Sequence, residues 1–301
     1  MAAMVDVIVV GAGIIGLTAA VRLRTAGFDV VVWSPVDPLD TVSAVAAAVW
    51  YPTRTAYDPR VLAWAGETYD EFTRQARDGV PGILLRPARH LGAATELPWW
   101  APAAGRVAIV DGEVRFITPL VEMTTYLPWL REQIRLVRRG VYRLEEALAA
   151  APVVVNATGL AARELAADPA VHPARGQIVL VANPGIETSV RAEGEPSTYV
   201  HPRSRDVVLG GTFEEDVWDT TPDPATRDAI LARCRALVPE LADAPIVGEK
   251  VGLRPVRRGG PRVQAEAVPG GTIVHAYGHG GAGMTLSWGC AGAIVRLCGV
   301  R

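Results

Sequence analysis

The apolar positions of the first 34 residues follow three successive patterns. A run rich in β-branched residues from Val5 to Val10 is typical of a strand that is buried on both faces. Apolar residues with helical spacing then extend from about Ile14 to Thr25, and Gly27 predicts the end of that helix. A second apolar run from Asp29 to Trp33 predicts another strand. The chain therefore opens with a strand, a helix and a second strand.

The first turn of this unit has the glycine spacing of a dinucleotide-binding site. Gly11, Gly13 and Gly16 form the pattern Gly-x-Gly-x-x-Gly between the strand and the helix. The first glycine permits a tight turn, the second lets backbone N–H groups approach a pyrophosphate, and the third lets the helix pack on the strand. The N-terminal end of the helix adds partial positive charge. We therefore expect a dinucleotide to bind at this turn.

The end of the second strand departs from the usual pattern. An acid normally binds the adenosine ribose here, but the sequence reads Trp-Ser-Pro-Val-Asp-Pro and Pro35 occupies the acid's position. Asp37 follows two residues later. The sequence leaves two alternatives for the ribose: Asp37, or main-chain groups together with Ser43.

The rest of the chain alternates between helical and strand patterns. Helices are predicted at 58–76, after Thr118 with Pro119 in the first turn, at 223–241, and from about Met284. Strands or hairpins are predicted at 106–117, 151–159, 174–184, 197–213 and 248–266. The sheet of the first unit resumes at 151–159 after an intervening segment, which indicates interleaved domains.

Composition and charge narrow the class of protein. The 301 residues have a formal net charge of -2 and are 50 % hydrophobic, so the chain supplies a packed core but no basic field for nucleic acid. No apolar run approaches the roughly 20 residues that a membrane span needs. The three cysteines lack metal-ligand spacing. We expect a cytoplasmic enzyme that holds no metal and binds neither nucleic acid nor a membrane.

Several segments share the motifs of one enzyme family. The most specific are Val-Gly-Leu-Arg-Pro-Val-Arg-Arg from Val251 and His-Ala-Tyr-Gly-His-Gly-Gly-Ala-Gly from His275. Arg-Gly-Gln at 175–177 and Leu-Gly-Gly-Thr at 209–212 add to them. With the N-terminal glycine pattern, these motifs make the chain resemble the D-amino acid oxidase family of flavoenzymes, which includes D-aspartate oxidase, over essentially its full length.

The resemblance implies a fold and a cofactor. The cofactor is FAD, and the glycine-rich segment after His275 passes beside its isoalloxazine ring. The implied fold is α/β, with a Rossmann-like FAD-binding domain interleaved with an α+β substrate-binding domain. We expect the first domain to comprise residues 1–54, 136–180 and 255–301, and the second to comprise 55–135 and 181–254.

The resemblance also implies the site residues. Arg254 would bind the substrate carboxylate with help from the Tyr199 hydroxyl, and the carbonyl of Gly281 would accept a hydrogen bond from the amine. These contacts would select the D enantiomer. We expect no role for His201, on the opposite strand face from Tyr199, and a structural role for His279. The residues expected to bind FAD are Gly11, Gly13, Ile14, Ile15, Gly16, Ser43, Ala47, Ala48, Val49, Gly159, Gly278, Gly280, Gly283, Met284 and Thr285.

The family contains enzymes for neutral and for acidic D-amino acids, and the sequence favours neutral ones. Phe213 occupies a position where an enzyme for acidic substrates would tend to offer an arginine, and Glu214 and Glu215 beside it would repel an anion. In the acidic alternative, Arg191 would hold the second carboxylate. The segment 191–198, where the family has its lid, is short and predicts an open entrance with broad side-chain tolerance.

Three other functions stay open on the sequence. A glycine or sarcosine oxidase would share the N-terminal pattern but not the motifs at Val251 and His275 in this form. An NAD-dependent dehydrogenase is compatible with the first unit alone, and a flavin-binding module without activity would not need a substrate clamp. The expected oxidase uses dioxygen and yields a 2-oxo acid, ammonia and hydrogen peroxide. The resemblance also allows a homodimer.

Overall fold

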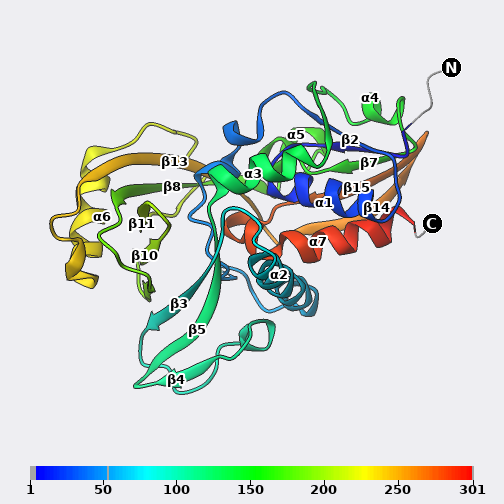
Figure 1. The fold of residues 1–301 in the computed structure, drawn as a ribbon. Coiled ribbons are helices and arrows are strands. Elements are labelled where there is room, and N and C mark those ends of the chain that lie inside the picture. The colour runs from blue at the N-terminus through cyan, green and yellow to red at the C-terminus, as the bar shows by residue number, and fades with distance from the viewer. Residues whose placement is uncertain (1–4, 53, 300–301) are drawn as a thin grey trace.

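The computed structural model describes residues 5–52 and 54–299, which form two β-sheets with helices packed against them (Figure 1). The first sheet has six strands and is parallel except at the edge strand β14. In spatial order its strands are β14 (Arg262–Val268), β15 (Gly271–Tyr277), β7 (Val153–Asn156), β1 (Val7–Val10), β2 (Val30–Ser34) and β6 (Arg135–Arg138). The predicted N-terminal unit is therefore the centre of a Rossmann-like sheet.

The second sheet has nine strands and is mainly antiparallel. In spatial order they are β12 (Glu214–Glu215), β8 (Val171–Ala182), β11 (Asp206–Gly210), β10 (Thr198–Pro202), β9 (Ser189–Ala192), β3 (Ile83–Leu91), β5 (Glu113–Val121) and β4 (Ala108–Val110), while β13 (Ile246–Arg257) pairs with β8. Strand β8 is buried along almost its whole length because β13 and β11 flank it. Two sheets built from alternating chain segments confirm the predicted α/β class.

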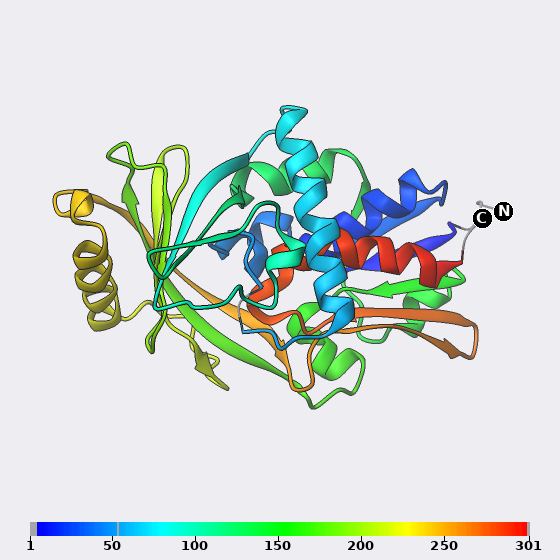
Figure 2. The same ribbon diagram turned by 90° about the horizontal axis from the view of Figure 1, so that it is seen from below.

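The helices cover the sheets in distinct places. Their bounds are α1 (Ile14–Thr25), α2 (Pro59–Arg77), α3 (Met123–Glu132), α4 (Glu145–Leu148), α5 (Ala162–Leu165), α6 (Pro224–Leu237) and α7 (Gly283–Cys298). Helices α1 and α7 lie side by side against the first sheet, and α2 crosses α7 (Figure 2). Helix α6 covers the outer face of the second sheet (Figure 1). Within the described ranges, no helix is both long and apolar enough to cross a membrane.

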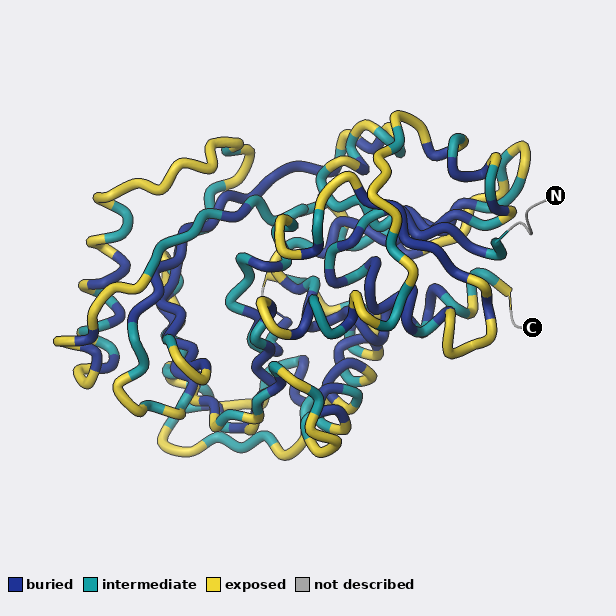
Figure 3. The backbone as a smooth tube through the Cα atoms, turned by 45° about the horizontal axis from the view of Figure 1, so that its top comes forward, coloured by how far each residue is buried: buried dark blue, intermediate teal, exposed yellow. Residues whose placement is uncertain are grey.

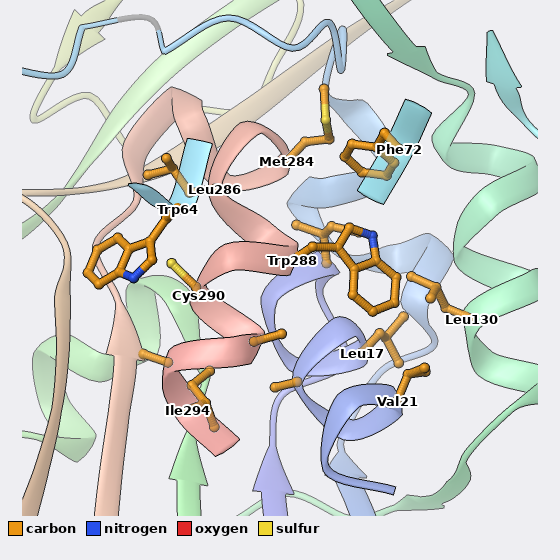
Figure 4. Packing of buried hydrophobic residues seen from close by; sticks show 14 of the residues in the cluster. Leu17, Val21, Trp64, Phe72, Leu130, Met284, Leu286, Trp288, Cys290 and Ile294 are labelled. Carbon is orange, nitrogen blue, oxygen red and sulfur yellow. The ribbon is translucent and has the colours of Figure 1, made fainter. Parts of the chain in front are cut away.

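The largest apolar core joins α1, α2, α3 and α7. Leu17 and Val21 of α1 approach Trp288 of α7, as Figure 4 shows, and the Trp288 indole donates a hydrogen bond of 3.0 Å to the Tyr126 hydroxyl. A methyl group at Gly289 would overlap the backbone of Trp64 in α2. The buried positions in Figure 3 follow the strands and these helices. One C-terminal glycine thus serves helix packing.

One predicted helix begins too early. The helix expected after Thr118, with Pro119 in its first turn, is wrong for its first residues, because Thr118 to Val121 continue strand β5 and the helix starts at Met123. The strand persists because β5 pairs with β3 and the Trp50 amide donates to the Pro119 carbonyl at 2.8 Å. These contacts come from distant segments, so tertiary pairing overrides the local helix signal.

The sheets also bear on the expected domain boundary at residue 180. Strand β8 (Val171–Ala182) pairs with β11 and β13 in the second sheet, although residues up to 180 were expected in the first domain. The boundary expected at residues 254 and 255 similarly falls inside β13. Both expected boundaries therefore fall inside long strands, β8 and β13, that pair with each other in the second sheet.

Candidate active site

A cavity of about 690 Å³ is lined by residues from both sheets and from the glycine loop before α7. Every site residue predicted from the sequence lines it except two, Gly16 and Thr285. A methyl group at Gly16 would overlap the Gly11 carbonyl oxygen, so this glycine serves the packing of α1. The Thr285 hydroxyl donates 3.0 Å to the Tyr51 carbonyl and accepts 3.1 Å from its amide. Both residues therefore support neighbouring segments of the cavity wall without lining the cavity.

The N-terminal turn of α1 fits a bound phosphate. The Ile14 amide donates to the Ser43 hydroxyl at 3.0 Å, and the Leu17 amide donates to the Gly13 carbonyl at 3.0 Å. Between them, the amides of Ile15 and Gly16 have no acceptor among the described residues, and of the two only Ile15 lines the cavity. Free amides at a helix N-terminus are the groups that bind a pyrophosphate. This end of the cavity therefore has the donor set that a dinucleotide needs.

The acid expected near the ribose lies elsewhere. Asp37 caps the short helix Pro38–Asp40 by accepting from the Leu39 amide at 3.1 Å, and it does not line the cavity. Asp40 and Ser43 do line it. Of the two alternatives, the structure therefore disfavours Asp37, because capping directs its carboxylate to the local turn.

The glycine loop reaches the cavity through positive backbone angles and close packing. Gly278 has φ +80°, and a methyl group there would lie 2.5 Å from the Arg257 Cβ. Gly280 has φ +55°, while Gly281 is exposed beside it. Only glycine tolerates both the positive φ and the close Arg257 side chain at Gly278. The loop can therefore present its main chain to a flat ligand.

His279 lies in this loop with its side chain buried. Burial lowers the pKa of His279 to about 4, so the imidazole is neutral near pH 7. Its Nε2 atom lies 3.4 Å from the Cys290 Sγ atom of α7, and its backbone forms a bridge with Val256. The predicted structural role agrees with these contacts.

Arg254 and Tyr199 come together from different strands. Arg254 of β13 donates from Nη1 to the Thr212 carbonyl at 3.1 Å, and its guanidinium also lies beside the Tyr199 hydroxyl of β10. Burial raises the pKa of Tyr199, against the lowering effect of Arg254, so the phenol keeps its proton. No carboxylate within the described ranges pairs with Arg254. A cation and a phenol therefore face the cavity together, which suits a carboxylate ligand.

The strand face expected for His201 is wrong. Its imidazole stacks on the Tyr199 ring with a centroid distance of 4.7 Å and an interplanar angle of 13°. Residues two apart on a strand share a face, so His201 and Tyr199 point to the same side. The His201 Nδ1 atom lies 2.8 Å from the Ser189 hydroxyl, and burial followed by Arg191 lowers its pKa well below 6.5. His201 lines the cavity as a neutral ring.

Three further cavity residues were not assigned from the sequence. The Arg191 guanidinium lies over the Tyr51 ring, with its Cζ atom 4.7 Å from the ring centroid. The ring centroids of Tyr51 and His90 are also 4.7 Å apart. Burial and then Arg191 lower the pKa of His90 to about 3. Arg54 pairs with Glu195 at 2.5 Å across the cavity rim. Tyr51 and Arg54 follow Ala47, Ala48 and Val49, which are expected to bind FAD, but no sequence signal marks His90, which strand pairing alone brings here.

The charges beside Phe213 differ from the expectation. Phe213 lines the cavity near two guanidinium groups, with Arg54 4.2 Å and Arg254 5.4 Å from its ring centroid. Glu214 instead pairs with Arg175 at 2.9 Å, and neither it nor Glu215 lines the cavity. The two carboxylates therefore do not face the cavity as expected, because strand β12 pairs with β8 and Glu214 is held by Arg175.

Comparisons with known proteins agree with this geometry. The sequence profile of the family described as FAD dependent oxidoreductase matches residues 6–142 and 129–297. D-amino-acid oxidase of Rubrobacter xylanophilus is 47% identical, covering 97% of this chain and 95% of the relative. D-aspartate oxidase of Homo sapiens is 34% identical, covering 96% and 93%. Among solved structures, glycine oxidase from Bacillus cereus has a TM-score of 0.82 at 18% identity and covers 98% of this chain and 97% of its own.

Proposed function

Because the chain belongs to the FAD-dependent oxidoreductase family, we propose that it oxidises D-amino acids to 2-oxo acids and ammonia, with dioxygen as the electron acceptor and hydrogen peroxide as a product. The observation that supports this most is the Arg254–Tyr199 pair, which faces the same cavity as the α1 turn and the glycine loop. The named relatives from Rubrobacter xylanophilus and Streptomyces coelicolor support the same assignment.

The cofactor is FAD, and the residues of the cavity fit it. The free amide of Ile15 lines the cavity and suits the pyrophosphate, while Asp40 and Ser43 line the same cavity and are the candidates for binding the ribose. When bound, FAD supplies the hydride acceptor for the substrate. We also propose that the other residues expected to bind FAD contact it in this cavity.

The chain's own residues would bind and orient the substrate. Arg254 offers a planar pair of donors to the carboxylate, and the protonated Tyr199 hydroxyl adds a third. The exposed Gly281 main chain would accept a hydrogen bond from the amine. Two fixed contacts leave one enantiomer with its α-hydrogen toward the flavin, which gives selectivity for the D form. The neutral His90, His201 and His279 side chains leave no protonated imidazole in the site near pH 7.

We propose neutral D-amino acids as the main substrates. The side-chain region is formed by rings, including Phe213 and Tyr51, and Tyr51 covers the guanidinium of Arg191. One observation favours acidic substrates as the second candidate: Arg191 lines the cavity and pairs with no carboxylate in the described parts of the chain. Comparing kcat/KM for D-alanine, D-valine, D-methionine and D-aspartate decides between them, with Arg191→Leu as the variant that would selectively lose D-aspartate turnover.

An anaerobic absorbance scan tests the function itself. We expect D-alanine to bleach the yellow flavin band and L-alanine to leave it unchanged, with recovery and peroxide after air is admitted. Bleaching by glycine or sarcosine with similar efficiency would favour the glycine oxidase alternative. A colourless protein would contradict FAD binding, and a yellow protein that no amine bleaches would contradict the oxidase proposal.

We also propose three coarser features. The two sheets correspond to a cofactor domain and a substrate domain, with β8 and β13 passing between them. Three free cysteines, two of them buried, suit the reducing cytoplasm. A homodimer stays a prediction, which the elution volume of the holoenzyme in size-exclusion chromatography would test.

A further inference from the structure

Two sequence motifs place glycines beneath the Arg254–Tyr199 pair. Gly176 belongs to Arg-Gly-Gln on β8, and Gly210 and Gly211 belong to Leu-Gly-Gly-Thr at the end of β11. None of the three has a φ in the left-handed region. A left-handed backbone therefore does not explain them, and a glycine in or beside a strand otherwise marks a close approach of another group.

At Gly176 the approaching group is the Arg254 guanidinium. Arg254 of β13 is paired with Ala174 of β8, so Gly176 is its diagonal neighbour on the same face. A methyl group at Gly176 would overlap Nη1, Nη2 and Cζ of Arg254 together. The guanidinium thus lies directly on the Gly176 backbone.

At Gly210 and Gly211 the approaching group is the Tyr199 ring. Tyr199 and Gly210 are direct cross-strand partners. A methyl group at Gly210 would overlap the ring at Cζ, and one at Gly211 would lie 2.6 Å from the hydroxyl oxygen. His201 stacks on the same ring at 4.7 Å. The phenol is therefore fixed by backbone and by an imidazole.

Such crowding is not general for strand glycines in this sheet. Gly248 lies on the same strand as Arg254, and a methyl group there would meet only the Leu180 Cδ1 atom, at an ordinary contact distance of 3.6 Å. We propose that Gly176, Gly210 and Gly211 form a glycine seat that fixes the Arg254 guanidinium and the Tyr199 phenol and thereby sets the affinity for the substrate carboxylate. The proposal rests on the proposed function, since it assigns the carboxylate to this pair.

The first test measures carboxylate binding without turnover. Propanoate, which is D-alanine without its amine, is titrated into the holoenzyme by calorimetry, and the FAD dissociation constant is measured in parallel. For Gly176→Ala we expect the propanoate dissociation constant to rise at least about tenfold, because a displaced guanidinium loses its charge-assisted hydrogen bonds to the carboxylate, with FAD affinity unchanged. Gly248→Ala is the matched control and should bind propanoate like the wild type.

A double-mutant cycle separates the seat from general packing. Arg254→Lys removes the guanidinium that a methyl group at Gly176 would overlap. In this background, Gly176→Ala should therefore have almost no further effect on propanoate binding. Gly210→Ala in a Tyr199→Ala background gives an independent second cycle. If Gly176→Ala alone fails to fold, recovery of folding in the Arg254→Lys background supports the seat.

Two results would overturn the proposal. One is wild-type propanoate affinity in Gly176→Ala and Gly210→Ala. The other is a loss of propanoate affinity that is as large in the Arg254→Lys or Tyr199→Ala background as in the otherwise wild-type protein. Such a result would show a packing defect unrelated to Arg254 or Tyr199. The proposed function fails separately, when wild-type protein binds propanoate but D-alanine does not bleach its flavin.

Discussion

The two ends of the cavity differ in where their residues come from. At the cofactor end, Gly11, Gly13 and Ser43 belong to one local unit and its following loop, and the Ile14 amide bonds directly to Ser43. At the substrate end, Arg254 and Tyr199 come from two strands and rest on glycines of two others. A local unit can bind its ligand through backbone amides, whereas the substrate end depends on correct assembly of a whole sheet. Substitutions at the two ends should therefore fail in different ways.

Removing the cation of the substrate end should have the largest effect. Arg254→Ala leaves Tyr199 alone with the substrate carboxylate, and loss of one partner of a buried charged hydrogen bond costs about 2–5 kcal/mol. We expect kcat/KM for D-alanine to fall about 1000-fold while the flavin absorbance stays normal. Arg258→Ala, which removes an exposed arginine next to the end of the same strand, is the control. Loss of FAD from Arg254→Ala would show that the two ends are not separable.

The cofactor end should fail by losing FAD. Gly11 has φ +113°, and a methyl group there would approach the Ala157 carbonyl. Gly11→Ala should weaken FAD binding at least tenfold and lower the free energy of unfolding by about 1–3 kcal/mol. Gly27→Ala shares the positive φ, at +91°, but meets nothing within 4 Å, so it separates backbone strain from the clash. Equal FAD loss in both variants would contradict the role of close approach.

This difference also explains what the sequence can predict. The N-terminal unit, the hairpin at 197–213 and the glycine loop carry local signals, so their structures follow from short motifs. The start of α3 does not, because the pairing of β5 with β3 keeps Thr118 to Val121 extended. The contact of His90 with Tyr51 depends on register between distant strands. The wrong prediction for His201 does not come from tertiary structure, because residues two apart on a strand share a face and the local sequence alone places His201 beside Tyr199.

The histidines of the substrate end should make stability depend on pH. The pKa of His90 is lowered to about 3 by burial and by Arg191, below the ordinary value near 6.5. Its contribution to stability is therefore complete above pH 6.5 and is lost as the pH falls toward 3, at up to about 1.4 kcal/mol per pH unit. Chemical denaturation of His90→Gln between pH 7 and 4 should show a shallower slope than the wild type. An unchanged slope would mean that His90 titrates alike in both states.

The smallest effect is expected from the hydroxyl that joins the loop to α1 at the cofactor end. Ser43→Ala leaves the Ile14 amide without its 3.0 Å acceptor, and loss of such a cap costs about 1 kcal/mol. We expect the melting temperature of the protein to fall by about 2 °C and FAD affinity to fall slightly, while propanoate binding to the holoenzyme stays unchanged. Ser43→Thr keeps the hydroxyl and should restore both values. A change in propanoate affinity would instead mean that the α1 turn also positions Arg254, so that local and assembled ends act as one unit.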